Sequence, residues 1–154
     1  MISLGINQLS GVIPEAIGQL VALQNLYLGG NQLEGEIPPK LFECKRLCEI
    51  SLESNQLSGA IPEAIGQLVA LQNLCLLENQ LSGAIPEAIG QLVALQSLYL
   101  HNNQLSGVVP HVAMAQLTKL RGLTLESNPG LTITAEGEKL IMDAVEDKNA
   151  DFSF

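Results

Sequence analysis

The chain has 154 residues, of which 47% are hydrophobic, which is enough apolar material for the core of one domain and argues against intrinsic disorder. Seven Lys and Arg against 16 Asp and Glu give a net charge of −9, which argues against binding to nucleic acid or to an anionic membrane surface. Only 3% of the residues are aromatic, so we expect a regular core of Leu, Ile, Val and Ala. The chain lacks a stretch of roughly 20 apolar residues that would span a membrane, and residues 1–5 do not resemble a signal peptide.

A repeat of 24 residues runs along the chain. An Asn recurs at intervals of 24, 24, 24, 24 and 25 residues, as Asn7, Asn31, Asn55, Asn79, Asn103 and Asn128. After each of the first five of these Asn residues, a Gly follows at the fourth position and a Pro at the seventh. The one-residue excess falls between Pro110 and Leu120. A fixed period of this length indicates a solenoid, in which each unit buries its apolar face against the next.

Each unit contains a short predicted strand with the spacing L-x-L. Side chains alternate along a strand, so we expect Leu26 and Leu28 to point inward and Tyr27 to point outward. Stacked units then place their strands side by side in a parallel sheet. The Asn that follows each strand can bond backbone groups of neighbouring units that would otherwise be buried without partners. We therefore predict that the six Asn form a structural ladder.

A short helical turn is predicted on the other side of each unit. In residues 62–66 a Pro stands first, a Glu lies near the N-terminus of the turn and a Gly ends it. Leu68 then packs inward as the chain returns to Leu71.

The full pattern L-x-x-L-x-L-x-x-N-x-L-x-G-x-I-P, seen from Leu71 to Pro86, resembles the leucine-rich repeat family, and its 24-residue form resembles the plant-type subclass. The resemblance covers about residues 2–133. It implies an α/β repeat solenoid, a right-handed superhelix with a parallel β-sheet on the concave face, short 3-10 or helical turns on the convex side and a C-terminal capping helix. Departures are few, such as Ile50 for a Leu and Val109 for an Ile.

The two ends of the repeat array differ. We expect about six units in residues 1–133, the first incomplete, and a capping helix with an acidic tail in residues 134–154. Thr134 is the predicted N-cap, and the predicted apolar stripe of the helix is Leu140, Ile141, Ala144 and Val145. Because residue 1 lies inside a repeat, the N-terminal apolar edge is expected to be covered by a longer chain, covered by a second copy through self-association, or left partly open.

The cysteines and the glycosylation sequons bear on the cellular compartment. Cys44 replaces the buried Leu of other units, and neither a Cys44–Cys48 disulfide nor a metal site is expected at Cys44, Cys48 and Cys75. The paired Cys caps of many secreted members and Asn-x-Ser/Thr sequons are missing. These features favour a reducing, cytoplasmic location, with an extracellular one if a leader was removed.

We expect no catalytic residues and no cofactor. The sequence has no phosphate loop, no nucleophile elbow and no His-x-x-x-His pair. Ser51 and His101 should lie about 10 Å apart, too far for a nucleophile and its base. Cys75 and His101 lack a third metal ligand, and His101 is expected to pair with Glu126 across neighbouring strands.

The differences between the repeats indicate a binding surface. Residues 55–70 recur identically at 79–94, whereas the eight positions before each block agree only at two inward Leu. The alternative explanation for these differences is that any exposed position changes without constraint. Exposed convex positions such as Glu63 and Gln67 should then differ as well, but they are identical between these copies. The predicted partner-binding residues are Tyr27, Glu49, Ser51, Glu53, Asn73, Cys75, Leu77, Glu78, Tyr99, His101, Asn102, Thr124 and Glu126.

The chemistry of this face predicts the partner. Tyr27 and Tyr99 are candidate hot spots, and four Glu make the face acidic, so we expect a protein or peptide with a basic or polar surface. By resemblance, the chain is a non-catalytic recognition module of an immune or signalling protein. The alternatives are a receptor-ectodomain fragment or an inhibitor of secreted hydrolases, and a structural or ice-binding protein, which the mixed outward residues disfavour.

Overall fold

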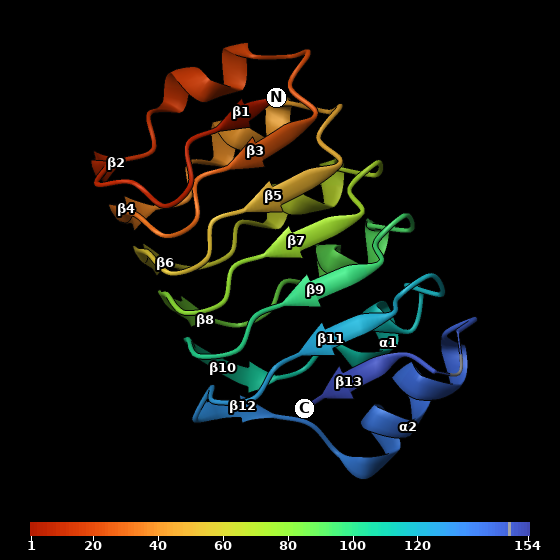
Figure 1. The fold of residues 1–154 in the computed structure, drawn as a ribbon. Helices are drawn as coiled ribbons and strands as arrows, with labels where there is room; N and C mark the ends of the chain where they lie inside the picture. Colours follow the sequence, from red (N-terminus) through yellow and green to blue (C-terminus); the bar gives the residue numbers. More distant parts are fainter. Residues whose placement is uncertain (148) are drawn as a thin grey trace.

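In the computed structural model, which describes residues 1–147 and 149–154, the chain winds into a solenoid with two parallel sheets (Figure 1). The concave sheet has the strand order β1-β3-β5-β7-β9-β11-β13. Its strands are β1 (Ile2–Ser3), β3 (Asn25–Tyr27), β5 (Glu49–Ser51), β7 (Asn73–Cys75), β9 (Ser97–Tyr99), β11 (Gly122–Thr124) and β13 (Asp151–Ser153). The expected leucine-rich-repeat architecture is confirmed.

A second parallel sheet, for which the sequence carries no strand pattern, follows the Asn of each unit. Its strands are β2 (Ser10–Val12), β4 (Gln32–Glu36), β6 (Gln56–Gly59), β8 (Gln80–Gly83), β10 (Gln104–Val108) and β12 (Gly130–Thr132). The Q-L-S-G segments are short and rich in Gly and Ser, so they carry no strand alternation. Pairing between neighbouring units, such as Gly59 with Leu81, creates this sheet.

The convex side carries the predicted helical turns. They are the 3-10 helices η1 (Glu15–Gln19), η2 (Pro39–Glu43), η3 (Glu63–Gln67) and η4 (Glu87–Gln91), and the helix α1 (His111–Met114). The extra residue of the fifth interval is accommodated in α1. There the N–H of Met114 bonds the carbonyl of Pro110 at 2.9 Å, four residues back, whereas Ile65 bonds Pro62, three residues back.

The core is a ladder of Leu and Ile side chains, and Cys44 occupies one of its positions with no exposed surface. Asn79 shows how the buried Asn side chains join the units. Its Oδ1 accepts from the N–H of Leu57 at 3.0 Å, and its Nδ2 donates to the carbonyls of Leu52 and Leu76 at 3.0 and 3.2 Å. Each inner Asn therefore bonds backbone of its own unit and of the preceding unit.

The C-terminal end is covered by helix α2 (Ala135–Ala144) and strand β13. The hydroxyl of Thr134 accepts from the N–H of Gly137 at 3.1 Å, as an N-cap does. The buried face comprises Gly137, Ile141 and Val145, whereas Leu140 is 42% exposed, so the predicted stripe was partly wrong. Gly137 is buried because α2 approaches the ring of His111, from which a Cβ would lie only 3.0 Å away.

Part of the predicted acidic tail is a strand of the concave sheet, not only a solvent-exposed surface. Residues 151–153 form β13, which pairs in parallel with β11 and extends the concave sheet. The division of the chain at residue 133 stays a prediction, because the two parts share this sheet. Within the described residues, no helix has the length and apolarity needed to cross a membrane.

Candidate partner-binding face

The strand register brings the outward side chains of the concave sheet into rows. One row follows the middle of the sheet and contains Ser3, Tyr27, Ser51, Cys75, Tyr99, Thr124 and Ser153. The next row contains Asn25, Glu49, Asn73, Ser97, Gly122 and Asp151. Seven of the thirteen predicted partner-binding residues therefore lie on adjacent strands of one surface. The other six follow directly after the strands: Glu53, Leu77, Glu78, His101, Asn102 and Glu126.

Tyr27 is held in place by its neighbours. Its hydroxyl donates to the carboxylate of Glu49 on β5 and accepts from Nδ2 of Asn25 at 3.2 Å. The hydrogen bond to Glu49 raises the pKa of the Tyr27 hydroxyl. A side chain fixed in this way loses less conformational freedom when a partner binds. Asn25 thus orients Tyr27, although the sequence analysis did not include it among the binding residues.

The ring of Tyr99 lies over Gly122 of the neighbouring strand, where no side chain occupies the space. A Cβ added to Gly122 would lie 2.8 Å from Oη and 3.1 Å from Cε1 of Tyr99. Gly122 therefore permits the observed position of the Tyr99 ring. The only sequence signal for this role is the Gly itself, at a strand position that carries a polar side chain in neighbouring units.

Glu53 interacts with three neighbouring positions. Its Oε2 accepts from the hydroxyl of Ser51 at 2.6 Å, and its carboxylate lies over Gly29, where a Cβ would be 2.2 Å from Oε1. Burial, followed by the charge of Glu53, raises the pKa of the Cys75 thiol to about 12. Cys75 is therefore a neutral thiol near pH 7, with little of the thiolate that nucleophilic chemistry or metal binding requires.

The predicted pair of His101 and Glu126 does not form. The ring Nδ1 of His101 lies 2.6 Å from the hydroxyl of Thr124, and the His ring makes no ion pair with Glu126. In the register of β9 and β11, Thr124 faces Tyr99, two residues before His101, and its hydroxyl can serve either imidazole tautomer of His101. Ser51 is bonded to Glu53, so Ser51 and His101 have separate partners.

Three of the four acidic side chains of the face have hydroxyl donors, and none of the four has a cationic partner among the described residues. Glu49 accepts from Tyr27, Glu53 from Ser51, and Glu78 from Ser54 at 2.7 Å. The ion pairs between described residues lie elsewhere, at Lys40–Glu43, Arg121–Asp147 and Lys139–Asp143. The face therefore presents negative charge that other described side chains do not neutralise.

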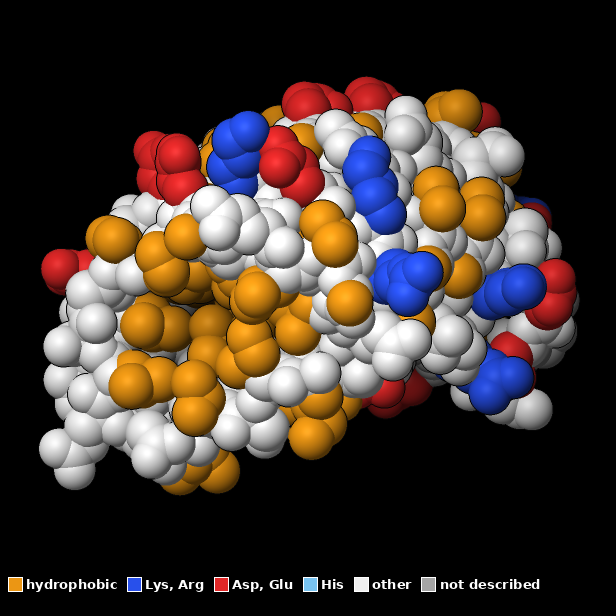
Figure 2. All heavy atoms as spheres, turned by 90° about the horizontal axis from the view of Figure 1, so that it is seen from above, with side chains coloured by type: hydrophobic (Ala, Val, Ile, Leu, Met, Phe, Trp, Pro, Cys, Tyr) orange, Lys and Arg blue, Asp and Glu red, His pale blue; other side chains and the backbone are white. Residues whose placement is uncertain are grey.

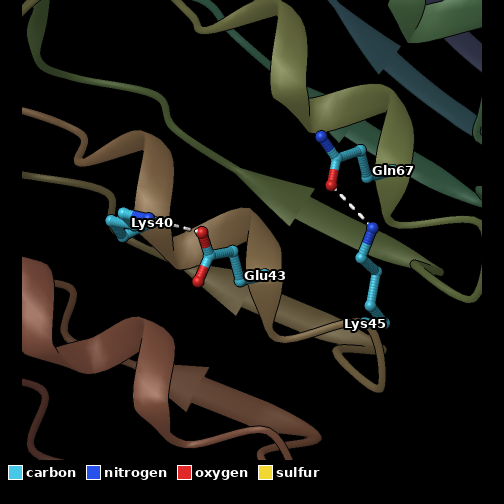
Figure 3. Close-up of polar contacts among 4 residues, drawn as sticks. All are labelled: Lys40, Glu43, Lys45 and Gln67. Atoms are coloured by element: carbon cyan, nitrogen blue, oxygen red, sulfur yellow. Dashed lines mark hydrogen bonds and ion pairs between the residues drawn. The ribbon is translucent and has the colours of Figure 1, made fainter.

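Two cations of the convex side are engaged there. Lys40 donates to Glu43 at 2.8 Å within η2, and Lys45 donates to Oε1 of Gln67 in η3 at 2.6 Å (Figure 3). Both contacts lie at the helical turns rather than on the concave sheet. Charge is thus distributed unevenly between the two sides of the solenoid.

The N-terminal end of the solenoid is an open apolar groove. It has a volume of about 430 Å³, and Figure 2 shows the hydrophobic side chains gathered in a hollow at this end. Its lining residues are all uncharged: Ile2, Leu4, Leu9, Ser10, Val12, Ile13, Pro14, Ala16, Ile17, Leu20, Leu26, Leu28 and Leu33. Leu20, which corresponds to a fully buried Leu in inner units, is 44% exposed here.

The sequence profile of the Leucine Rich Repeat family matches residues 22–44, 46–68 and 94–113. The leucine-rich repeat ectodomain of the receptor kinase SOBIR1 from Arabidopsis thaliana is similar in structure, with a TM-score of 0.82, 32% sequence identity, and coverage of 87% of this chain and 72% of that one. The chain belongs to the leucine-rich repeat family.

Longer leucine-rich repeat proteins are similar over part of their length. The ectodomain of GASSHO1/SCHENGEN3 from Arabidopsis thaliana, in complex with CASPARIAN STRIP INTEGRITY FACTOR 2, gives a TM-score of 0.79 at 38% identity, covering 88% of this chain and 16% of that one. The Arabidopsis receptor kinase HAESA, in complex with the peptide hormone IDA and the co-receptor SERK1, gives a TM-score of 0.79 at 34% sequence identity. The match covers 86% of this chain and 26% of that one. No protein matched in a comparison with curated sequences.

The comparisons contradict the expected cytoplasmic location of this leucine-rich repeat protein. The similar structures include the ectodomains of plant membrane receptor kinases, which are extracellular parts. The missing Cys caps and sequons were therefore a poor guide to the compartment. Cys44 is buried in the repeat core, and all three cysteines are free.

Proposed function

We propose that this leucine-rich repeat protein is a non-catalytic recognition module that binds a protein or peptide through its concave face. The binding residues are the thirteen predicted from the sequence, with Tyr27 and Tyr99 as the principal anchors. The observation that carries the proposal is the clustering of repeat-to-repeat differences on one in-register surface that contains both Tyr of the chain.

The charge of the face supports a basic or polar partner. Glu49, Glu53 and Glu78 accept hydrogen bonds from uncharged hydroxyl groups and form no ion pair with described residues, so their negative charges remain available to a partner. Charges of opposite sign on a partner would increase the association rate and favour the correct partner over acidic competitors. Seven strands about 4.8 Å apart give a sheet about 30 Å wide, which suits an interface of standard size.

We infer that the module is extracellular and is the ligand-recognition part of an immune or signalling receptor. Similar structures include receptor kinase ectodomains, and two of them are complexes, with CASPARIAN STRIP INTEGRITY FACTOR 2 and with the peptide hormone IDA. We infer that this chain shares with those ectodomains an extracellular location and a peptide as the class of ligand. The identity of the ligand is not inferred from them.

Selection from a random peptide library, followed by calorimetry, tests the concave face. We expect selected peptides to be rich in Lys, Arg and polar residues. Tyr27→Ala combined with Tyr99→Ala should weaken their binding by about thirtyfold or more, since a hot-spot aromatic residue contributes about 2 kcal/mol or more.

The matched control is the convex double variant Val69→Ala and Val93→Ala, whose parent side chains are 57% and 55% exposed. It should bind the same peptides with unchanged affinity. Equal affinity of the Tyr variant and the unaltered protein, or selection of acidic peptides, would contradict the proposal.

We also propose that the N-terminal groove supports self-association. The groove is apolar and uncharged, and the first 33 residues contain one acid, Glu15. Two copies of a chain with net charge −9 therefore meet with the least electrostatic repulsion at this end.

A further inference from the structure

Four of the seven Lys and Arg residues of the chain lie in two short segments, residues 44–48 and 117–121. Both segments lead from a convex helix into a concave strand, the first from η2 to β5 and the second from α1 to β11. All four cations are exposed. We call the surface formed by these two segments and by the two equivalent turns between them the basic edge. Its exposed residues are Lys45, Arg46, Val69, Val93, Lys119 and Arg121.

The strand register places the cations of the two segments in one line. Strands β5, β7, β9 and β11 pair in parallel with equivalent residues opposite one another. Arg46 and Lys119 therefore occupy the same repeat position, with Ala70 and Ala94 between them. Since neighbouring strands are about 4.8 Å apart, the three intervals from Arg46 to Lys119 span about 14 Å.

The middle of the basic edge is uncharged and partly apolar. Val69 and Val93 follow Lys45 at the neighbouring repeat position, and they are 57% and 55% exposed. In Figure 2, Lys and Arg side chains lie in a row on the face beside the N-terminal hollow, with separate hydrophobic side chains around them. The basic edge thus has cations at both ends and exposed methyl groups between them.

The first pair of cations keeps its positive charge. The nearby acid Glu43 is bonded by Lys40 at 2.8 Å. Lys45 donates to the uncharged amide oxygen of Gln67 at 2.6 Å, which leaves two of its three N–H donors for a partner. The side chain of Arg46 forms no ion pair with a described residue. This end of the basic edge is therefore ready to bind a carboxylate.

The second pair of cations offers one free charge. Nε of Arg121 lies 3.8 Å from Oδ2 of Asp147, and Glu146 accepts from the hydroxyl of Thr118 at 3.3 Å. Lys119 lines a cleft of about 420 Å³ together with these two acids, but it forms no ion pair with a described residue. A single carboxylate can bind Lys119, whereas the two acids oppose a continuous polyanion.

The distance between the two ends matches an extended peptide. An extended chain advances about 3.4 Å per residue and its side chains alternate, so positions i, i+2 and i+4 point to one side over about 14 Å. Two acids four residues apart can therefore reach Arg46 and Lys119 together. The side chain midway between them then lies over Val69 and Val93.

We propose that the basic edge binds an extended acidic segment of a protein partner, with the pattern acid-x-apolar-x-acid. One carboxylate binds Arg46, the other binds Lys119, and the apolar side chain packs on Val69 and Val93. The net charge of −9 disfavours large polyanions such as nucleic acid, but a segment with two carboxylates interacts mainly with the charges nearest to it. The inference goes beyond the proposed function, because the concave face is acidic and takes a partner of the opposite charge.

The probe is the capped peptide acetyl-Glu-Ser-Leu-Ser-Glu-amide, titrated into the whole labelled chain. We expect saturable changes in the amide NMR signals of Arg46, Ala70, Ala94 and Lys119, with a dissociation constant of the order of millimolar. Added salt should weaken binding. The isomer acetyl-Glu-Glu-Leu-Ser-Ser-amide has the same composition and charge with its acids adjacent, and it should bind at least about threefold more weakly.

Arg46→Gln and Lys119→Gln, made one at a time, should each weaken binding of the probe about three- to fivefold, as expected for the loss of one exposed ion pair. Both parent side chains are exposed, so the variants should fold. The matched control is Lys139→Gln, which removes the same charge from α2, outside the basic edge, and should leave the affinity unchanged.

The proposal is overturned if the probe gives no saturable change at these amides, if both Gln variants bind it as tightly as the unaltered chain, or if the isomer binds equally well. A single-stranded oligonucleotide that binds at the same amides more tightly than the probe would replace the protein partner by a nucleic acid. The Tyr27→Ala, Tyr99→Ala variant should bind the probe unchanged. Failure of the concave-face proposal and failure of this one are therefore distinguishable.

Discussion

Single Asn side chains join neighbouring units because each one bonds several backbone groups of its own unit and of the preceding unit. Asn79 is 9% exposed and satisfies the N–H of Leu57 and the carbonyls of Leu52 and Leu76. Asn7 is exposed and bonds only the carbonyls of Leu4 and Gly5 in its own unit. The two Asn thus share a sequence position and differ in what they connect.

Asn79→Ala should lower the free energy of unfolding by about 1 to 3 kcal/mol, because it leaves the buried N–H of Leu57 without a partner and removes one of the two Asn donors from the carbonyls of Leu52 and Leu76. Asn7→Ala should lower it by less than about 1 kcal/mol, since the carbonyls that it bonds are accessible to water. Equilibrium unfolding in urea measures both values. Equal losses would show that the ladder does not stabilise contacts between units.

Cys75 should titrate far above an ordinary thiol, because burial and then the charge of Glu53 raise its pKa to about 12. Between the ordinary value of 9.0 and about 12, the unfolded chain releases this proton while the native chain keeps it. Native stability therefore falls as pH rises through this range.

Thiolate absorbance as a function of pH, taken as the difference between the unaltered chain and Cys75→Ser, measures the pKa of Cys75. Glu53→Gln should lower this pKa, and Glu87→Gln, on the convex side, should leave it unchanged. A titration near 9 in the unaltered chain would contradict the burial of the thiol beside Glu53.

At the scale of elements, the capping helix α2 buries only some of the apolar side chains in its sequence. Ile141 is fully buried and Leu140 is 42% exposed, although they are adjacent and of similar size. The close approach of Gly137 to His111 fixes the rotation of the helix, and Ile141 lies one turn further along the same face.

Ile141→Ala should lower the free energy of unfolding by about 2 to 5 kcal/mol through the loss of buried surface and the cavity left behind. Leu140→Ala should lower it by less than about 1 kcal/mol. Thermal unfolding followed by circular dichroism measures the difference. A larger loss for Leu140→Ala would mean that the helix packs through the other face.

The elements that could be predicted from sequence are those whose signal lies within one unit. The L-x-L strands, the Pro-initiated turns and the Thr134 cap each depend on neighbouring residues. The second sheet and β13 could not be predicted in this way, because they form only when distant segments pair, as Asp151 does with Gly122.

The same distinction applies to the candidate site. The outward rows follow from strand alternation and the 24-residue period, so the sequence could place Tyr27 and Tyr99 on one face. Which hydroxyl bonds which acid could not be read from the sequence. Thr124 contacts His101, and Oε2 of Glu126 has no hydrogen-bond partner among the described residues, whereas Ser51 bonds Glu53.

At the scale of the whole molecule, the solenoid has two unlike ends. The C-terminal end is covered by α2 and β13, while the N-terminal end exposes an apolar groove of about 430 Å³ (Figures 1 and 2). Acids are distributed over the remaining surface, since 15 of the 16 follow residue 33.

Sedimentation should therefore reveal a concentration-dependent dimer. Leu9→Lys combined with Val12→Lys should abolish it, because two added charges would face the partner copy in an apolar interface. Val69→Lys with Val93→Lys, on the exposed convex side, should have no effect on association. A monomer at all concentrations would contradict self-association through this edge.

The most direct test of the account is to map a selected peptide onto the labelled chain by NMR titration. Binding through the concave face predicts that the amides of β3, β5, β7, β9 and β11 change most and that those of η1 to η4 change little. Changes concentrated in the helical turns, with the concave strands unaffected, would contradict binding through the concave face.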